Sequence, residues 1–265
     1  NSEQWRSGLK PKIQYDDPLC RVAYLYSIVP TNANLVDYVF GRDGELKDYL
    51  NDVQRKKSVI DICAFGGGPG TEMLGLAKRI EKIWRDGSLE NQLVLDFLLL
   101  DQVTEWLDSW RAIRRQIEER FSKNLGKDPR TWPLSIRGDH SGINILDTTN
   151  FGNLVTIFEQ DIYMLSYIIS EIFLDLDILK CFTTKIATNA PIGSKFLFID
   201  RKEEQWKNAI RDIAGQADII LSDFHDVDSS LSLDEQKTDL GEIYSCVSRN
   251  PRTTCRAFWV VGTKN

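Results

Sequence analysis

The amino-acid sequence predicts an α/β fold built around a mostly parallel sheet, and three observations support this. Apolar runs of strand length alternate with longer amphipathic stretches from about residue 58 to residue 200, which is the pattern of βα units that form a parallel sheet. A glycine-rich segment joins the first of these runs to a helix-like stretch. The chain has 265 residues, 42% of them hydrophobic, which is enough apolar material for one sizeable core or two small ones.

Helices are expected before the sheet begins. Apolar residues from Leu19 to Phe40 follow helical spacing that is interrupted near Pro30, as expected where a proline cannot continue a helix. We interpret these helices as a cap on the sheet. The sequence therefore divides into an N-terminal helical cap at residues 1–57 and a sheet-containing domain at residues 58–265.

Each strand is expected from a short apolar run bounded by turn residues. Between the first two runs, the apolar residues of Glu72–Trp84 form one stripe of an amphipathic helix, which predicts the first crossover. The expected strands are Ser58–Ala64, Leu93–Leu100, Leu134–Arg137, Ile162–Leu165, Lys195–Ile199, Asp218–Leu221 and Phe258–Val261.

The composition excludes several classes of protein. The net charge is −6, so a nucleic-acid partner would need a local basic patch. Five cysteines at wide spacings and only two histidines indicate neither a disulfide framework nor a metal site. We find no apolar stretch long enough to span a membrane and no signal segment. We expect an intracellular protein of the cytoplasm or nucleus, and because residue 1 is Asn, a piece of a longer chain.

The most informative segment is the glycine-rich turn after the first expected strand. It reads Val59-Ile-Asp-Ile-Cys-Ala-Phe-Gly-Gly-Gly-Pro-Gly-Thr-Glu72, a strand, a turn and a helix start in direct succession. Glycines allow positive φ angles and a close approach of a ligand to the backbone. A phosphate-binding loop would need a Lys after the last glycine, and here Glu72 places a carboxylate where phosphate would bind. The turn therefore favours a cationic ligand.

The order of these features resembles the class I, Rossmann-like S-adenosylmethionine-dependent methyltransferases over roughly residues 58–263. The matching features are the glycine-rich turn, Asp101 ending strand two, Gly138-Asp139 after strand three and Asp161–Tyr167 around strand four. The resemblance implies a seven-stranded, mostly parallel sheet with an antiparallel last strand, and S-adenosylmethionine as cofactor. Segment Asp161–Glu171 also resembles eukaryotic relatives of the fungal large-subunit rRNA uridine-N3 methyltransferases.

The resemblance also implies roles for individual residues. Asp101 would bind the ribose hydroxyls, and Asp139 with His140 would lie near the adenine amino group. The alternatives are a helix-capping role for Asp101 and a plain turn role for Asp139, whose counterpart could instead be Asp147. In most of the family an acidic residue stands where this chain has Ala64. The implied cofactor-binding residues are Ala64, Phe65, Gly66, Gly68, Gly70, Asp101, Gln102, Asp139, His140 and Ser166, and the residues implied to border the methyl group as catalytic residues are Ser166, Tyr167 and Glu171.

The methyl acceptor is less clearly indicated. The resemblance implies RNA modification, and the basic stretch Arg111–Arg130 is a candidate for contacts to RNA phosphates, although such a run is also typical of a solvated helix face. A small-molecule methyltransferase is one alternative. The other is a catalytically degenerate module that acts through a protein partner, because the sequence lacks the tetrapeptide typical of amino-group methyltransferases after strand four.

Overall fold

The structure is a computed structural model that describes residues 14–56, 58–89, 91–147, 155–172, 175–230, 233–247 and 250–265. The strands are β1 (Val59–Phe65), β2 (Leu93–Leu100), β3 (Leu134–Ser141), β4 (Ile162–Ser166), β5 (Lys195–Arg201), β6 (Ile219–Leu221), β7 (His225–Ser230) and β8 (Thr254–Lys264). The α-helices are α2 (Pro18–Ser27), α3 (Val29–Arg42), α4 (Gly44–Lys56), α5 (Thr71–Arg85), α6 (Trp106–Leu125), α7 (Ile168–Glu171), α8 (Leu176–Asn189), α9 (Glu204–Ala217), α10 (Leu233–Leu240) and α11 (Glu242–Cys246), with short 3-10 turns at Pro129–Thr131 and Val155–Phe158.

The strands form one sheet in the order β3-β2-β1-β4-β5-β8-β6, with β7 also paired to β8. Strands β1 to β5 run parallel to one another, whereas β8 is antiparallel to β5. This is the doubly wound α/β fold that the sequence predicts. The strand order reverses between β1 and β4, and in such sheets the carboxyl ends of the strands at the reversal form the ligand-binding crevice.

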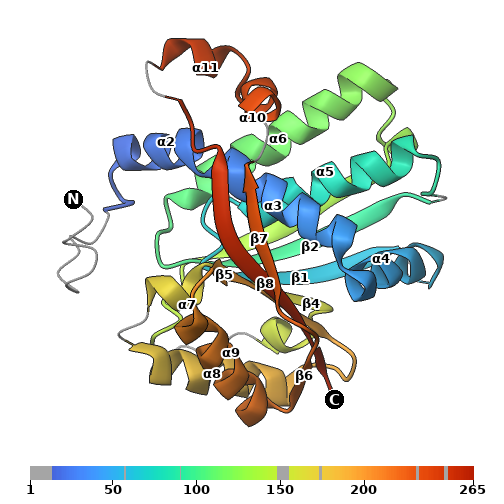
Figure 1. The fold of residues 1–265 in the computed structure, drawn as a ribbon. Coiled ribbons are helices and arrows are strands. Elements are labelled where there is room, and N and C mark those ends of the chain that lie inside the picture. The colour runs from blue at the N-terminus through green and yellow to red at the C-terminus, as the bar shows by residue number, and fades with distance from the viewer. Residues whose placement is uncertain are drawn as a thin grey trace.

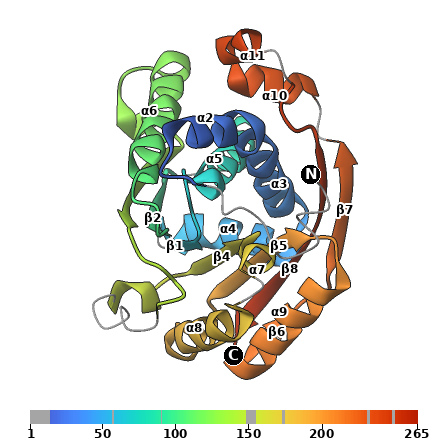
Figure 2. The same ribbon diagram turned by 90° about the vertical axis from the view of Figure 1, so that its left-hand side faces the viewer.

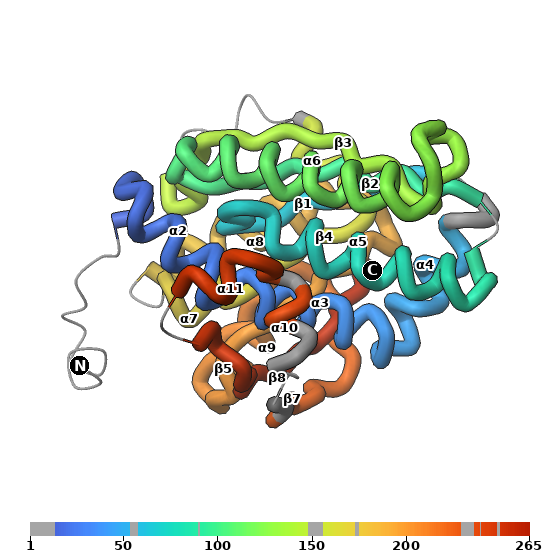
Figure 3. Tube along the Cα trace, turned by 90° about the horizontal axis from the view of Figure 1, so that it is seen from above, coloured from blue at the N-terminus to red at the C-terminus, as the bar shows by residue number. Residues whose placement is uncertain are grey.

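Helices cover both faces of the sheet and make two cores (Figures 1 and 3). On one face α3, α4, α5 and α6 pack their apolar residues against alternate residues of β1, β2 and β3. On the other face α7, α8 and α9 pack against the remaining residues of the strands. The alternation along each strand explains this division, because successive side chains of a strand point to opposite faces. The result is a three-layer arrangement.

Two strands differ from the sequence-based expectation at their ends. Strand β3 continues past Arg137 to Ser141, although Gly138-Asp139 suggests a loop. A Cβ atom on Gly138 would lie 2.1 Å from the Phe97 carbonyl oxygen, so the glycine allows close packing inside the sheet rather than a turn. Strand β8 is also longer than expected because it pairs with β5 on one side and with β6 and β7 on the other.

Among the described residues the sheet has eight strands rather than seven, because β7 forms in an acidic segment where the sequence predicts no strand. Val227 of this strand is buried, and the flanking Asp226 and Asp228 form ion pairs with Lys202 and Lys207 of neighbouring elements. Pairing of this segment with β8 along its whole length identifies it as a strand. The ion pairs neutralise the acidic residues around Val227, whose charge does not suggest a strand in the sequence.

Of the three N-terminal helices, α3 and α4 pack on the sheet, whereas α2 packs against α3. Helix α2 ends and α3 begins at Ile28. Pro30 lies in the first turn of α3, where a backbone amide would have no partner within the helix, so the proline breaks no hydrogen bond. Nearly every residue of α3 is buried, whereas Tyr26 is the one buried residue of α2. Figure 2 looks onto the carboxyl ends of the parallel strands, with α2 in front. Among the described helices, none is long and apolar enough to cross a membrane.

Close packing between α3 and α5 predicts a specific stability effect. A Cβ atom on Gly75 of α5 would lie 2.5 Å from the Ala33 carbonyl oxygen and 2.6 Å from the Val36 Cβ atom. We therefore expect Gly75→Ala to lower the free energy of unfolding by roughly 1–3 kcal/mol through overpacking, as measured by urea denaturation.

Gly215→Ala is the matched control, because Gly215 lies on an exposed face of α9 with open space around it. This variant should gain about 0.5–1 kcal/mol from the higher helix propensity of alanine. Equal effects of the two substitutions would contradict the tight contact between α3 and α5.

Candidate active site

The glycine-rich turn between β1 and α5 lies at the point where the strand order reverses. Gly66, Gly68 and Gly70 have φ angles of 63°, 46° and 84°, which side chains rarely adopt. The end of β2 holds this turn in place, because the amides of Gly66 and Gly67 donate to the Leu100 carbonyl oxygen at 2.8 and 3.3 Å. The three predicted glycines therefore form one rigid concave turn over the sheet edge.

Asp101 directly follows β2 and joins this turn to the next loop. Its Oδ2 atom accepts a hydrogen bond from the Gly68 amide at 3.0 Å, and its Oδ1 atom accepts one from the Val103 amide at 2.9 Å. Burial raises the pKa of Asp101 against the opposing effect of these bonds and of nearby His140. The carboxylate therefore has a structural role, and each oxygen retains a further lone pair for a ligand.

His140 and Asp139 point to opposite faces of β3. His140 lies on the same face as Asp101, and its buried Nε2 atom makes no hydrogen bond with any residue that the structure describes. Asp139 is exposed and accepts a hydrogen bond from the next backbone amide at 2.8 Å. Gln102 is also exposed. Of these three predicted residues, the structure brings His140 alone next to Asp101.

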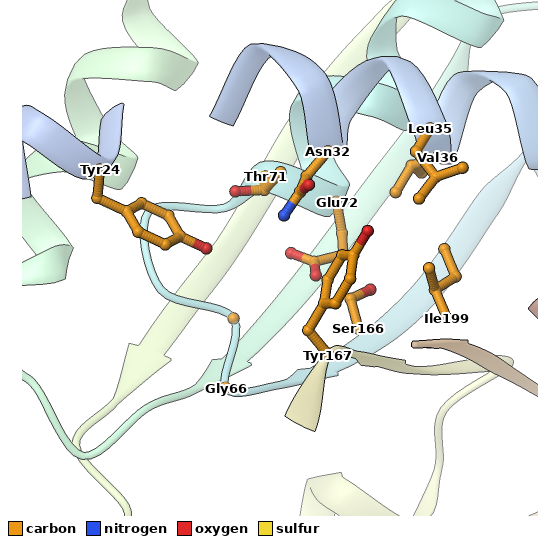
Figure 4. Close-up of a pocket in the computed structure, with 11 residues that line it drawn as sticks. Tyr24, Asn32, Leu35, Val36, Gly66, Thr71, Glu72, Ser166, Tyr167 and Ile199 are labelled. Carbon is orange, nitrogen blue, oxygen red and sulfur yellow. The ribbon is translucent and has the colours of Figure 1, made fainter. Parts of the chain in front are cut away.

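A small cavity lies above the glycine turn, between the sheet edge and the N-terminal helices (Figure 4). Its volume is about 20 Å³, little more than one water molecule needs. The residues that line it are Tyr24, Asn32, Leu35, Val36, Gly66, Gly67, Thr71, Glu72, Ser166, Tyr167 and Ile199. Helices α2 and α3 therefore form its roof, and the ends of β1 and β4 form its floor.

Glu72 is a buried carboxyl group that faces this cavity from the first turn of α5. The residue is 5% exposed, and its Oε2 atom has no hydrogen-bond partner among the described residues. Burial raises the pKa of Glu72 to about 7. Hydrogen bonds from its own backbone amide and from Ser166 oppose this effect, and nearby Asp101 adds a smaller upward contribution. Glu72 is therefore poised to gain or lose a proton near neutral pH.

Two more oxygen atoms without partners face the same cavity. Asn32 on α3 is 8% exposed and its Oδ1 atom accepts no hydrogen bond from the described residues. Ser166 ends β4, and its Oγ atom is buried beside Glu72 without a well-aligned hydrogen bond. Buried polar atoms are normally paired because leaving them unpaired costs stability. Three such atoms around one cavity indicate a site that accepts hydrogen-bond donors.

The other predicted residues on β1 and β4 have different surroundings. Tyr167 also lines the cavity with a φ of 62°, and its hydroxyl lies 3.3 Å from the Cys255 Sγ atom. Glu171 is exposed at the end of the one-turn helix α7. Ala64 is buried in the core on the α5 face, whereas the Phe65 ring packs on the opposite face against Phe182.

An aromatic cluster fills the space beside Asp101. The rings of Tyr15, Tyr24 and Trp106 lie 5.5 Å from one another in all three pairs. Burial raises the pKa of Tyr24 well above its usual value, and Glu171, Glu72, Tyr15 and Asp101 raise it further. Tyr24 therefore links the cavity that it lines with Glu72 to Trp106, which lies with Asp101 beside Gly68.

Sequence reasoning missed two residues at this site, Asn32 and Tyr24, and it also missed the burial of the Glu72 carboxyl group. The sequence shows Glu72 beside the glycine turn, but not that α3 buries its carboxyl group. Asn32 and Tyr24 lie far from the turn in the sequence, within helices expected only to cap the sheet. Asn32 is one of four buried polar residues of α3, with Thr31, Asn34 and Asp37, so the sequence of the helix does not single it out.

Comparison with known proteins yields similar folds only. No model of a known protein family and no curated protein matches the sequence. A SAM-dependent methyltransferase from Methanosarcina mazei is 8% identical, with 78% of this chain and 93% of that chain covered and a TM-score of 0.47. N-methyltransferase NodS from Bradyrhizobium japonicum, in complex with S-adenosyl-L-homocysteine, is 8% identical, with 85% and 90% covered and a TM-score of 0.43. A methyltransferase from Pyrococcus furiosus is 11% identical, with 84% of each chain covered and a TM-score of 0.43.

At these identities and TM-scores the similarity concerns the fold alone. The ligand and the reaction therefore depend on the residues of this chain.

The buried carboxyl group predicts a pH-dependent effect on stability. Because the pKa of Glu72 is about 7 in the fold, against 4.5 for an exposed glutamate, ionisation of Glu72 destabilises the fold as pH rises through this interval. Glu72→Gln removes the ionisable group, so we expect it to stabilise the protein by roughly 2 kcal/mol more at pH 8 than at pH 5.

Urea denaturation at the two pH values measures this difference. Asp86→Asn, at the exposed end of the same helix, is the control, and it should change the free energy of unfolding equally at the two pH values. An effect of Glu72→Gln that is independent of pH would mean that the Glu72 carboxyl group is solvated.

Proposed function

We propose that this chain binds S-adenosylmethionine and transfers its methyl group. The observation that carries the proposal is a set of three buried oxygen atoms, from Glu72, Asn32 and Ser166, around a cavity beside the glycine turn, none of which makes a well-aligned hydrogen bond with the described residues. The resemblance of the motifs to class I methyltransferases and the strand order of the sheet agree with it.

A primary ammonium group matches this cavity in size and in chemistry. It has three N–H donors and a positive charge, and it is about as large as a water molecule. The cavity has a volume of about 20 Å³ and presents three acceptors, one of them the Glu72 carboxyl group. The amino-acid end of S-adenosylmethionine carries such an ammonium group. Glu72 would then serve in place of the acidic residue that is absent at Ala64.

The charges around the site also favour a cation over a phosphate ester. Glu72, Asp101 and Glu171 all act on Tyr24, and no lysine or arginine among the described residues contributes to the pKa of Glu72 or Asp101. A phosphate group would be repelled by these carboxylates. At the other end of the site, Asp101 retains lone pairs that can accept ribose hydroxyl groups, and His140, whose pKa burial lowers, lies beside it.

S-adenosylmethionine supplies an electrophilic methyl group on a positively charged sulfur atom. The chain contributes position and the exclusion of water, which account for most of the rate in such a transfer. Glu72, Asn32 and Ser166 would fix the ammonium end, and the glycine turn would allow the ligand to lie against the backbone. Tyr167 and Ile199 line the same cavity with apolar surface that keeps water away.

The main alternative is a degenerate fold that acts only through protein contacts. Unpartnered buried oxygen atoms argue against it, because a scaffold without a ligand would bear their desolvation cost for no gain. The acceptor of the methyl group is a further proposal, with RNA as the first choice and a small molecule as the alternative.

Binding of S-adenosylhomocysteine tests the ammonium site directly. We expect Glu72→Gln to weaken this binding roughly ten- to hundredfold, because a charge-assisted hydrogen bond is lost. Binding of 5′-methylthioadenosine, which has the same adenosine and thioether but no amino-acid part, should be unchanged by the substitution. Isothermal titration with both ligands measures the two effects.

Asp86→Asn again serves as the control and should alter neither affinity. Failure of both the wild-type protein and Tyr24→Ala, a variant without the ring that lines the cavity, to bind S-adenosylhomocysteine at millimolar concentration would refute the proposed cofactor. If the substitution instead weakened the binding of both ligands equally, Glu72 would not be the residue that contacts the ammonium group.

If RNA is the acceptor, we expect the exposed cations of α6 and the following loop to contact its phosphates. Arg111, Lys123 and Lys127 are exposed and make no ion pair with the described residues, whereas the other four cations of Arg111–Arg130 are paired with acidic residues. Reversal of these three residues to Glu should weaken RNA binding for all sequences and flatten its salt dependence, as measured by fluorescence anisotropy.

Arg130→Glu provides the comparison, because Arg130 is already paired with Asp128 at 2.9 Å, and its effect should be smaller. RNA binding that responds neither to the triple reversal nor to salt would exclude this surface, and absence of RNA binding at low salt would favour the small-molecule acceptor.

A further inference from the structure

The cavity beside Glu72 is too small for the whole ligand that the proposed function requires. Pockets for ligands of this size usually have volumes of about 300–1,000 Å³, whereas this cavity has about 20 Å³. Tyr24 lines the cavity together with Glu72 (Figure 4), and its ring lies 5.5 Å from the ring of Trp106. Trp106 lies beside the Asp101 carboxylate at the glycine turn, because a Cβ atom on Gly68 would be 3.8 Å from Trp106 Nε1 and 3.9 Å from Asp101 Oδ2. A ligand bound to both Glu72 and Asp101 would therefore need the space that the Tyr24 ring fills. Tyr15 and Trp106 pack around that ring.

We infer that Tyr15 and α2 form a lid over the site, and that in the closed state the Tyr24 side chain occupies the place of the ligand. This inference rests on the proposed function and concerns the regulation of the same site. Opening of the lid would remove Tyr24 and Tyr15 from the space beside Asp101 while the glycine turn and Trp106 stay on the body of the protein.

Three features of α2 suit a part that moves. Tyr26 is the single buried residue of its ten, and the side chain of Leu19 is 76% exposed, so little apolar surface holds the helix to the body. The chain changes direction at Ile28 between α2 and α3, which provides a hinge. The well-buried α3 can remain in place when α2 moves.

Tyr15 moves with α2 because the two are joined by hydrogen bonds. The Arg21 Nη1 atom donates to the carbonyl oxygens of Tyr15 and Asp16, each at 2.8 Å. Asp17 caps the helix through the Leu19 amide at 2.8 Å. At the far end, the Arg252 amide donates to the Ser27 carbonyl oxygen at 3.1 Å, which holds the hinge side of α2 on the body.

Because only open molecules bind the ligand, the apparent association constant equals that of the open state multiplied by the fraction of molecules that are open. Removal of the Tyr24 ring raises that fraction. We therefore expect Tyr24→Ala to bind S-adenosylhomocysteine at least fivefold more tightly than the wild type and to associate with it faster. Leu19→Ala, on the outer face of the same helix, should change neither quantity.

The association kinetics of the wild type provide a second measurement that needs no variant. Trp106 lies 5.5 Å from both tyrosine rings, so its fluorescence should report opening, and Trp106→Phe identifies its share of the signal. In stopped-flow mixing with S-adenosylhomocysteine, the observed rate should level off at high ligand concentration, because opening of the lid then limits association.

The outcomes separate the lid from the proposed function. Weaker or unchanged binding by Tyr24→Ala, or a wild-type rate that rises linearly with ligand concentration, overturns the lid and leaves the cofactor assignment intact. If neither the wild type nor Tyr24→Ala binds the ligand, both are overturned. Binding by Tyr24→Ala alone supports both, and if this variant does not fold, the wild-type kinetics decide.

Discussion

The site depends on the way in which the end of β2 holds three successive amides of the glycine turn. The Leu100 carbonyl oxygen binds the amides of Gly66 and Gly67, and the Asp101 carboxylate binds the amide of Gly68. These bonds fix where α5 begins and therefore where Glu72 points. One carboxylate thus supports the turn and faces the crevice, so structure and binding share the same residue.

The sequence was sufficient to predict the layered α/β fold and all but one of the strands, because the buried strands are short apolar runs. It was insufficient for β7, because Val227 stands between two acidic residues whose charges Lys202 and Lys207 neutralise only in the folded structure. Its prediction for β3 ended too early, since Gly138 can indicate a turn or a close contact, and only the position of Phe97 distinguishes the two.

The site was predictable in part, for a related reason. The glycine turn and Asp101 are local in the sequence, so their spacing identifies them. Burial of Glu72, by contrast, depends on α3, and the position of Tyr24 depends on the packing of α2. The same limit applies to Asp139 and His140, whose opposite orientations follow from how far β3 extends. Long-range packing, rather than local pattern, decided these positions.

The N-terminal helices complete the site through contacts with the last part of the chain. Thr31 of α3 donates a hydrogen bond to the carbonyl oxygen of Arg252, 221 positions later, and Gln236 donates to Thr31 at 3.1 Å. During synthesis α2 and α3 leave the ribosome long before these partners do. Such distant contacts form late and slowly in folding. A nascent chain that has not yet reached Gln236 and Arg252 would therefore have the glycine turn without a secured roof, so assembly of the binding site waits for this later segment.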